Sequence, residues 1–207
     1  MTVARSSASV VQDGRPRCPW VELAKADYVA YHDQEWGVPV HDDHLMFEYL
    51  TLEGAQAGLS WYTVLRKRDA YRKAFANFDI ARVARFDARK IDALMANEGL
   101  VRHRQKLEST VGNARACLAV QKEFGSLCAF VWSFVEPAPL VNAPRTRAEY
   151  RATSAQSDRL SAALKRRGFK FVGSTIMYAF MQATGLVNDH AHDCFRQSEL
   201  VGVCAAR

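Results

Sequence analysis

One acid in this sequence, Glu53, is predicted to lie on the buried face of a helix. The i, i+3, i+4, i+7 spacing that defines one helical face is shared by Met46, Tyr49, Leu50 and Glu53. A buried carboxylate costs free energy unless it is paired with another group or serves a ligand. Glu53 is therefore either a salt-bridged core acid or the polar group of a binding site.

Aromatic residues whose rings carry polar atoms lie near Glu53 in the sequence. They are Tyr28, Tyr31, Trp36, Trp61 and Tyr62. Such side chains pack in ordinary cores, but rings placed around an acid also suit a cationic purine that stacks between them. The segment thus predicts either a plain aromatic core or a pocket for a positively charged base.

Four potential metal ligands stand near the two ends of the chain, Cys18 with His32 and His190 with Cys194. His190 and Cys194 are four residues apart, so a helix would bring them to one face, whereas His192 falls on a different face. Two thiolates and two imidazoles form a familiar structural zinc set, which would tie the two ends together. The alternative is four unrelated residues. A disulfide framework is disfavoured, because the five cysteines are odd in number and irregularly spaced.

A basic hairpin between two predicted helices, residues 91–116, has the features of an anion site. Gly99 allows a turn with exposed backbone amides, and the following helix directs its positive end toward that turn. The side chains expected to hold a DNA phosphate are Arg102, His103, Arg104 and Lys106. A helical hairpin with solvated basic residues is the alternative interpretation.

The elements that must position these residues are predicted to be helices almost throughout. Apolar periodicity, capping Asp and Ser residues and Gly or Pro breaks predict helices over 42–57, 61–75, 87–95, 103–117, 126–134, 154–168 and 174–185. Only 169–172 has the pattern of a strand. The fold class is therefore all-α, and we expect the two ends of the compact domain to meet.

The chain is predicted to hold one helical domain between two tails. We expect a disordered N-terminal tail over 1–16, the helical domain over 17–196 and a flexible C-terminal tail over 197–207. No stretch of about 18 apolar residues and no apolar signal-peptide core is present, so we expect a cytoplasmic protein without a membrane segment.

The net charge of +6 is distributed unevenly along the chain. Residues 18–60 hold one lysine against eight acids, whereas residues 99–117 hold four Lys or Arg against one acid and residues 159–170 hold five with no acid. A basic surface attracts polyanions such as DNA, and an acidic region beside it suits a cationic ligand. Charges solvated on helix faces would give the same counts.

With these residues assembled, the sequence closely resembles the bacterial-type 3-methyladenine DNA glycosylase I family of the helix-hairpin-helix superfamily. The matching strings are RCPW, YVAYHDQEWGVPV, LEGAQAGLSWYTVL, GLVRHRQKL, VGNARA, FVWSFV and LKRRGFKFVGSTIMYAFMQATGLVNDH, followed by Cys194. They extend over nearly everything from Cys18 to Cys194. The resemblance implies a helix-hairpin-helix glycosylase fold whose termini are tied by a structural zinc ion.

The resemblance also implies roles for individual residues. The zinc ligands would be Cys18, His32, His190 and Cys194. Glu53 would bond to the adenine edge as the catalytic-site acid, between the stacking residues Tyr31 and Trp61, and the rings near them would be Tyr28, Trp36 and Trp20. Leu59, in the turn AGLS, would enter the space that the base leaves. The expected partner is double-stranded DNA carrying an alkylated adenine, bound by a monomer.

The activity implied is monofunctional hydrolysis of the N-glycosidic bond in base-excision repair. Many members of the superfamily have a catalytic aspartate after the hairpin, yet residues 111–135 contain no Asp, a gap for which this family is known. No lysine matches the Schiff-base position of the lyase members, so strand cleavage is not expected. Two alternatives are a non-catalytic DNA-binding module and a zinc hydrolase or deaminase, although the HxE and PCxxC patterns of the deaminases do not occur.

Overall fold

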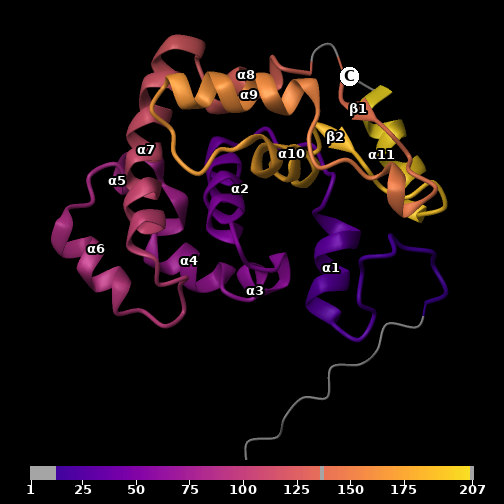
Figure 1. Ribbon diagram of the computed structural model, residues 1–207, viewed down its shortest axis with the longest axis horizontal. Coiled ribbons are helices and arrows are strands. Elements are labelled where there is room, and N and C mark those ends of the chain that lie inside the picture. The colour runs from indigo at the N-terminus through magenta and orange to yellow at the C-terminus, as the bar shows by residue number, and fades with distance from the viewer. Residues whose placement is uncertain (1–12, 136–137, 206–207) are drawn as a thin grey trace, which may run out of the picture.

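The computed structural model describes residues 13–135 and 138–205, and this part of the chain is almost entirely helical (Figure 1). The α-helices are α1 (Ala26–Gln34), α2 (Asp43–Gln56), α3 (Trp61–Leu65), α4 (Arg68–Ala74), α5 (Ile80–Val83), α6 (Ala88–Met95), α7 (Arg104–Phe124), α8 (Leu127–Trp132), α9 (Ala155–Arg166), α10 (Ser174–Ala183) and α11 (Phe195–Ala205). Two 3-10 turns, η1 (Ala76–Phe78) and η2 (Arg147–Glu149), complete the helical elements. The all-α prediction is confirmed.

Side-chain caps fix several of the predicted helix starts. Asp42 accepts a hydrogen bond from the backbone N–H of Leu45 at the start of α2, and Ser60 accepts one from Thr63 at the start of α3. Helix α9 has a full capping box, in which Ser154 and Ser157 bond reciprocally. The predicted helix over 61–75 is divided, because the chain leaves regular α-geometry between Leu65 and Arg68.

The strand expected over 169–172 is not formed. Phe171 has a φ of +57°, which a regular strand does not allow, and the backbone of Lys170 bonds to the side chain of Asn113 instead of to a strand. Strand pairing occurs elsewhere, where β1 (Leu140–Val141) runs parallel to β2 (Val187–Asn188) with Leu140 beside Val187. The segment after α9 is therefore a loop held by side-chain hydrogen bonds.

Helix α2 occupies the centre of the molecule, and the other helices pack around it (Figure 1). Every residue from Met46 to Ala55 is buried, so α2 has no solvent-exposed face over this stretch. Helices α8 and α10 contact α2 directly, α9 packs on α10, and α7 packs on α5, α6 and α8. In the part of the chain that the structure describes, no helix is both long and apolar enough to cross a membrane.

The two ends of the described chain meet beside α1, as expected. The backbone N–H of Phe195 donates to the carbonyl of Pro16 over 3.0 Å, and Arg17 forms an ion pair with Asp33 of α1 at 2.7 Å. Residues 1–12 of the predicted disordered tail lie outside the described residues, whereas 13–16 are held against the domain by these contacts. Of the predicted flexible tail over 197–207, residues 206 and 207 lie outside the described residues. Residues 197–205 belong to α11, in which Leu200 is buried beside Gly37.

Candidate functional site

A cavity of about 270 Å³ opens between α1, α2, α3 and α10. Its lining residues are Trp20, Tyr28, Tyr31, Trp36, Glu53, Gln56, Trp61, Tyr150, Arg151, Ala179 and Gln182. The structure thus brings together Glu53 and the five rings that the family resemblance placed around the base. Tyr62, which the sequence pattern also placed near Glu53, does not line the cavity, and its hydroxyl donates to Asp27 instead. The volume is near the lower end of small-ligand sites.

Glu53 lies in this cavity wall, near the end of α2, with only 3% of its surface exposed. Its Oε2 atom is buried and has no hydrogen-bond partner among the described residues. Burial raises the pKa of the Glu53 carboxyl from 4.5 to about 8, because the charged form loses its hydration. An unpaired buried carboxyl of this kind can serve as the polar group of a binding site.

The salt-bridged core acid of α2 is Glu48, five residues before Glu53. Its carboxylate binds Arg68 and Arg72 of α4, with the Arg72 pair at 2.9 Å. Arg68 also binds Glu35, which caps the end of α1. This network joins α1, α2 and α4, and among the described residues Glu53 itself forms no ion pair with a basic side chain.

Aromatic rings line the cavity around Glu53. Tyr31 and Trp61 are in contact, with their ring centroids 5.4 Å apart, and Tyr28 stacks beside Tyr31 at 6.5 Å. Burial raises the pKa of Tyr31 well above its usual value of 10.0, so its hydroxyl keeps its proton and can donate. The buried Nε1 of Trp61 lacks a partner. The walls therefore offer flat surfaces and unused donors to a polar, planar ligand.

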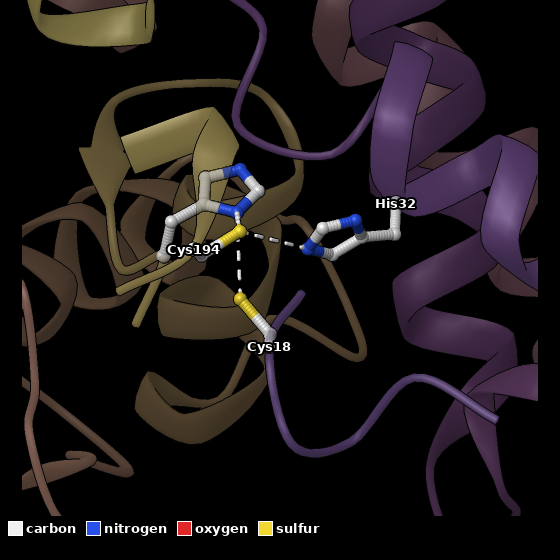
Figure 2. Close-up of side chains that lie close together, drawn as sticks. Cys18, His32 and Cys194 are labelled. Carbon is white, nitrogen blue, oxygen red and sulfur yellow. Dashed lines mark hydrogen bonds between the residues drawn. The ribbon is translucent and has the colours of Figure 1, made fainter. Parts of the chain in front are cut away.

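The four predicted metal ligands converge at the junction of the two chain ends, and their ligating atoms all lie within 4.8 Å of one another. Figure 2 shows the Cys194 sulfur facing both Cys18 and Nε2 of His32. The Cys18 and Cys194 sulfurs lie 3.4 and 3.5 Å from Nδ1 of His190, and the Cys194 sulfur lies 3.5 Å from Nε2 of His32. This buried group of soft donors can hold a metal ion.

Neighbouring acceptors fix which imidazole nitrogen each histidine directs into the cluster. Nδ1 of His32 lies 2.7 Å from the Asp33 carboxylate, and Nε2 of His190 lies 3.1 Å from the carbonyl of Trp36. Each outer nitrogen therefore carries the proton, and the inner nitrogen presents its lone pair. A hydrogen bond from Cys18 is the main cause that lowers the pKa of the Cys194 thiol, with further contributions from His190 and His32. The same contact and burial raise the pKa of Cys18, so without an ion the pair shares one proton, which binding of a metal would displace.

The metal cluster supports the walls of the cavity. The Trp20 ring contacts His32 with a centroid distance of 5.2 Å, and the Trp36 ring contacts His190 at 4.6 Å. Gly37 packs against the same histidine, since a Cβ atom there would lie 3.0 Å from Nε2 of His190. The two histidines at the junction of the chain ends therefore pack directly against two walls of the cavity.

The predicted basic hairpin is the turn between α6 and α7. Arg102 and His103 are exposed, and His103 caps α7. Arg104 is half-exposed and pairs with Asp92 at 2.5 Å, so part of its charge is already compensated. The amide of Gly99 bonds to Asn97, and a Cβ at Gly99 would lie 2.7 Å from that of Ala70. Gly99 is therefore needed for close packing on α4 and does not offer its amide to an anion.

Lys106 does not lie on the DNA-facing surface that we predicted for it. Only 8% of this residue is exposed, and its Nζ donates to the carbonyls of Ala55 and Ala57 over 2.8 and 2.6 Å. The ammonium satisfies orphan carbonyls at the end of α2, a position that the helix dipole favours for a cation. Lys106 thereby holds the turn before Leu59, and the Leu59 side chain is 41% exposed.

Five lining residues were missed at the sequence level: Gln56, Tyr150, Arg151, Ala179 and Gln182. Gln56 is one turn beyond Glu53, so the same helical spacing that singled out Glu53 would have found it. Ala179 and Gln182 are likewise one turn apart on α10. Tyr150 and Arg151 lie outside the helices, where no periodicity signals their position.

Comparisons with known proteins agree along the whole helical part of the chain. A sequence profile of the family described as "Methyladenine glycosylase" matches residues 20–197. The "DNA-3-methyladenine glycosylase" of Haemophilus influenzae is 52% identical over 86% of this chain and 96% of its own length. "DNA-3-methyladenine glycosylase 1" of Escherichia coli is 49% identical over 86% of this chain and 95% of its own.

Solved structures give the same result. A crystal structure of a 3-methyladenine DNA glycosylase I has a TM-score of 0.84 at 48% identity and covers 87% of this chain and 98% of that chain. The 3-methyladenine DNA glycosylase I of Staphylococcus aureus, described for its recognition of 3-methyladenine, has a TM-score of 0.81 at 37% identity. It covers 84% of this chain and 92% of that chain.

Proposed function

The chain belongs to the methyladenine glycosylase family, and from this premise we propose that it hydrolyses the N-glycosidic bond of 3-methyladenine flipped out of duplex DNA. The observation that carries the proposal is the unpaired carboxyl of Glu53 in an aromatic cavity. Methylation at N3 makes the attached adenine formally cationic. An acid without a basic partner, enclosed by aromatic faces, is suited to bind such a base.

In the proposed complex, Tyr31 and Trp61 stack on the flipped base while Glu53 bonds to its polar edge. Tyr28, Trp36 and Trp20 form the remaining aromatic walls. A cationic base beside Glu53 lowers the pKa of that carboxyl from its raised value in the empty cavity. Binding therefore ionises Glu53 and releases a proton, and the ion pair forms in a water-poor site where it is strong.

The chemistry needs little from the protein, because the base is already a good leaving group. The C1′–N9 bond breaks, its electron pair neutralises the purine, and water adds to C1′ with loss of a proton to solvent. The ionised Glu53 favours the cationic substrate and the positive charge that develops on the sugar. No lysine is among the described residues that line the cavity, which supports hydrolysis without a Schiff base and hence without strand cleavage.

We further propose that the Cys18, His32, His190 and Cys194 cluster holds a structural zinc ion. Tetrahedral zinc with bonds of about 2.3 Å to sulfur and about 2.0 Å to nitrogen places sulfur and nitrogen about 3.5 Å apart. The corresponding distances here are 3.4 to 3.5 Å. Four protein ligands leave no open coordination position, so the ion would tie the chain ends and brace the cavity walls without taking part in the reaction.

Duplex DNA is proposed to bind across the α6–α7 turn and the turn that carries Leu59. Arg102, His103 and Arg104 would contact backbone phosphates, while Leu59 would fill the space vacated by the base. Lys106 connects these two surfaces from inside, because it is on α7 and bonds to the carbonyls before Leu59.

Release of base from N-methylated duplex DNA tests the function. The wild-type protein is expected to release free 3-methyladenine and to leave the strand uncut, as measured by chromatography of the base and gel analysis of the DNA. Glu53→Gln should reduce release by at least about 100-fold, since it removes an ionic interaction in a buried site. Gln56→Ala, in the same cavity one turn away, is the matched control. Duplex binding without base release by the wild-type protein would instead favour a non-catalytic DNA-binding module.

A further inference from the structure

A second buried acid, Asp189, lies next to the cavity and fixes the orientation of a lining residue. Asp189 follows β2 and is 2% exposed. It accepts hydrogen bonds from Asn142 Nδ2 at 2.5 Å, from the Tyr178 hydroxyl at 2.8 Å and from Gln182 Nε2 at 2.7 Å. Only Gln182 among these donors lines the cavity, so Asp189 acts on the site through Gln182.

The chemistry of this contact determines which end of the Gln182 amide is left for a ligand. The Asp189 oxygens accept from all three of these donors, and the Gln182 group that faces them is the NH₂, with Nε2 at 2.7 Å. The other end of the planar amide is the carbonyl oxygen, Oε1, which accepts no hydrogen bond from the described residues and belongs to a side chain in the cavity wall. The cavity therefore contains a fixed neutral acceptor in addition to the carboxyl of Glu53.

Gln182 and Glu53 reach the cavity from two helices that pack on each other. Glu53 and Gln56 are one turn apart on α2, and Ala179 and Gln182 are one turn apart on α10. All four line the same space. A planar ligand held between the aromatic rings thus meets acceptors that come from both helices.

We propose that Gln182 is a specificity-determining residue whose Oε1 accepts a hydrogen bond from the exocyclic 6-amino group of the bound base, and that Asp189 is its positioning residue. This inference rests on the proposed function. A base with a 6-oxo group would place a carbonyl against the Gln182 carbonyl, which leaves two acceptors opposed and unsatisfied. The wall of α10 thereby selects 6-amino purines over 6-oxo purines.

Binding of two free bases that differ at the 6-position, and in the ring proton that accompanies a 6-oxo group, tests this assignment. Quenching of tryptophan fluorescence measures the affinity for 3-methyladenine and for 3-methylhypoxanthine, since three tryptophans line the cavity. Gln182→Met keeps a similar shape but removes the acceptor, and it should reduce the preference for 3-methyladenine by about 10- to 100-fold. Gln56→Met is the matched control and should leave the preference within about twofold of the wild type. An unchanged preference in Gln182→Met overturns the proposal.

The positioning role of Asp189 has its own readout. In Asp189→Asn the residue at 189 can donate as well as accept, so the Gln182 amide can turn and present its NH₂ to the ligand. The affinity for 3-methylhypoxanthine should then rise relative to that for 3-methyladenine, whereas a merely structural loss would weaken both equally and contradict the positioning role.

The proposed function and the Gln182 assignment can be refuted separately. If the wild-type protein releases no base from methylated DNA, the proposed function is wrong. If it releases 3-methyladenine while Gln182→Met keeps the wild-type preference between the two bases, the function stands and the Gln182 assignment is wrong. Should Asp189→Asn fail to fold, Gln182→Met still decides the specificity assignment, and Asn142→Ala then tests the positioning role, since loss of a donor that holds Asp189 should weaken the preference.

Discussion

Replacing Glu53 by glutamine is expected to change how the stability of the ligand-free protein depends on pH. Burial raises the pKa of this carboxyl from 4.5 to about 8. Between these values the folded chain keeps a proton on Glu53 that the unfolded chain has released, so the free energy of unfolding falls as pH rises. Glutamine is never ionised, and the variant therefore lacks this loss.

The magnitude follows from the same two values. Raising the pKa of Glu53 from 4.5 to about 8 means that the free energy of unfolding falls by at most roughly 5 kcal/mol as pH rises. The full decrease is reached only above pH 8. Near pH 4.5 the variant and the wild type should be about equally stable. Above pH 8 the variant should be more stable by a few kcal/mol, a large fraction of what stabilises an ordinary domain. The lowered pKa values of Asp33 and Asp43 act below pH 4 and are shared by both proteins.

Urea unfolding followed by circular dichroism from pH 5 to pH 9 measures this difference directly. All other titratable groups are the same in both proteins, so the difference between them isolates Glu53. Gln56→Ala should show the wild-type pH dependence, because it alters the same cavity without removing a carboxyl. A stability difference between Glu53→Gln and the wild type that stays constant over this range would refute the assignment of Glu53 as a buried, unpaired acid.

Three further results are expected. Mass spectrometry of the native protein should find one zinc ion per chain; Cys18→Ser should lose it and lower Tm by roughly 10 °C or more, whereas His192→Ala should retain it. Lys106→Met should lower the free energy of unfolding by about 1 to 3 kcal/mol and leave the dependence of duplex affinity on salt concentration unchanged. Arg102→Ala should leave stability intact but reduce the slope of that salt dependence by about one phosphate contact. A changed slope for the Lys106 variant would contradict its internal role. Leu59→Ala should slow single-turnover release of 3-methyladenine from duplex DNA by about 10-fold or more, without weakening the binding of free 3-methyladenine. Equal losses in the release assay and the binding assay would place Leu59 in the base cavity instead.

Local patterns in the sequence were sufficient for the helices and for much of the site. Helical spacing predicted that Glu53 is buried, and it is, although α2 is buried on all sides from Met46 to Ala55. Asp42 and Ser60 start the helices that they were expected to cap. The four-residue separation of His190 and Cys194 did bring them together, although it did so in the turn before α11 and not on a helix. These features depend on near neighbours in the chain, which a sequence displays directly.

The partners of the charged groups were not visible in the sequence. Lys106 had the spacing of a phosphate-binding lysine, yet it lies against the end of α2, fifty residues earlier in the chain. Likewise, helical spacing marks both Glu48 and Glu53 as residues of α2, but only the position of α4 shows that Arg68 binds the first and not the second. Pairing of this kind depends on how distant helices pack.

The sequence by itself determined the fold class, the family resemblance and the kinds of side chain in the site, because periodicity, capping and ligand spacing are local properties. Only the tertiary structure decided that Glu53 keeps an unpaired oxygen and that Asp189 fixes the amide of Gln182 in the same cavity. The physical reason is that the free energy of a buried polar group depends on which donors and acceptors surround it in space, and those come from segments far apart in the chain.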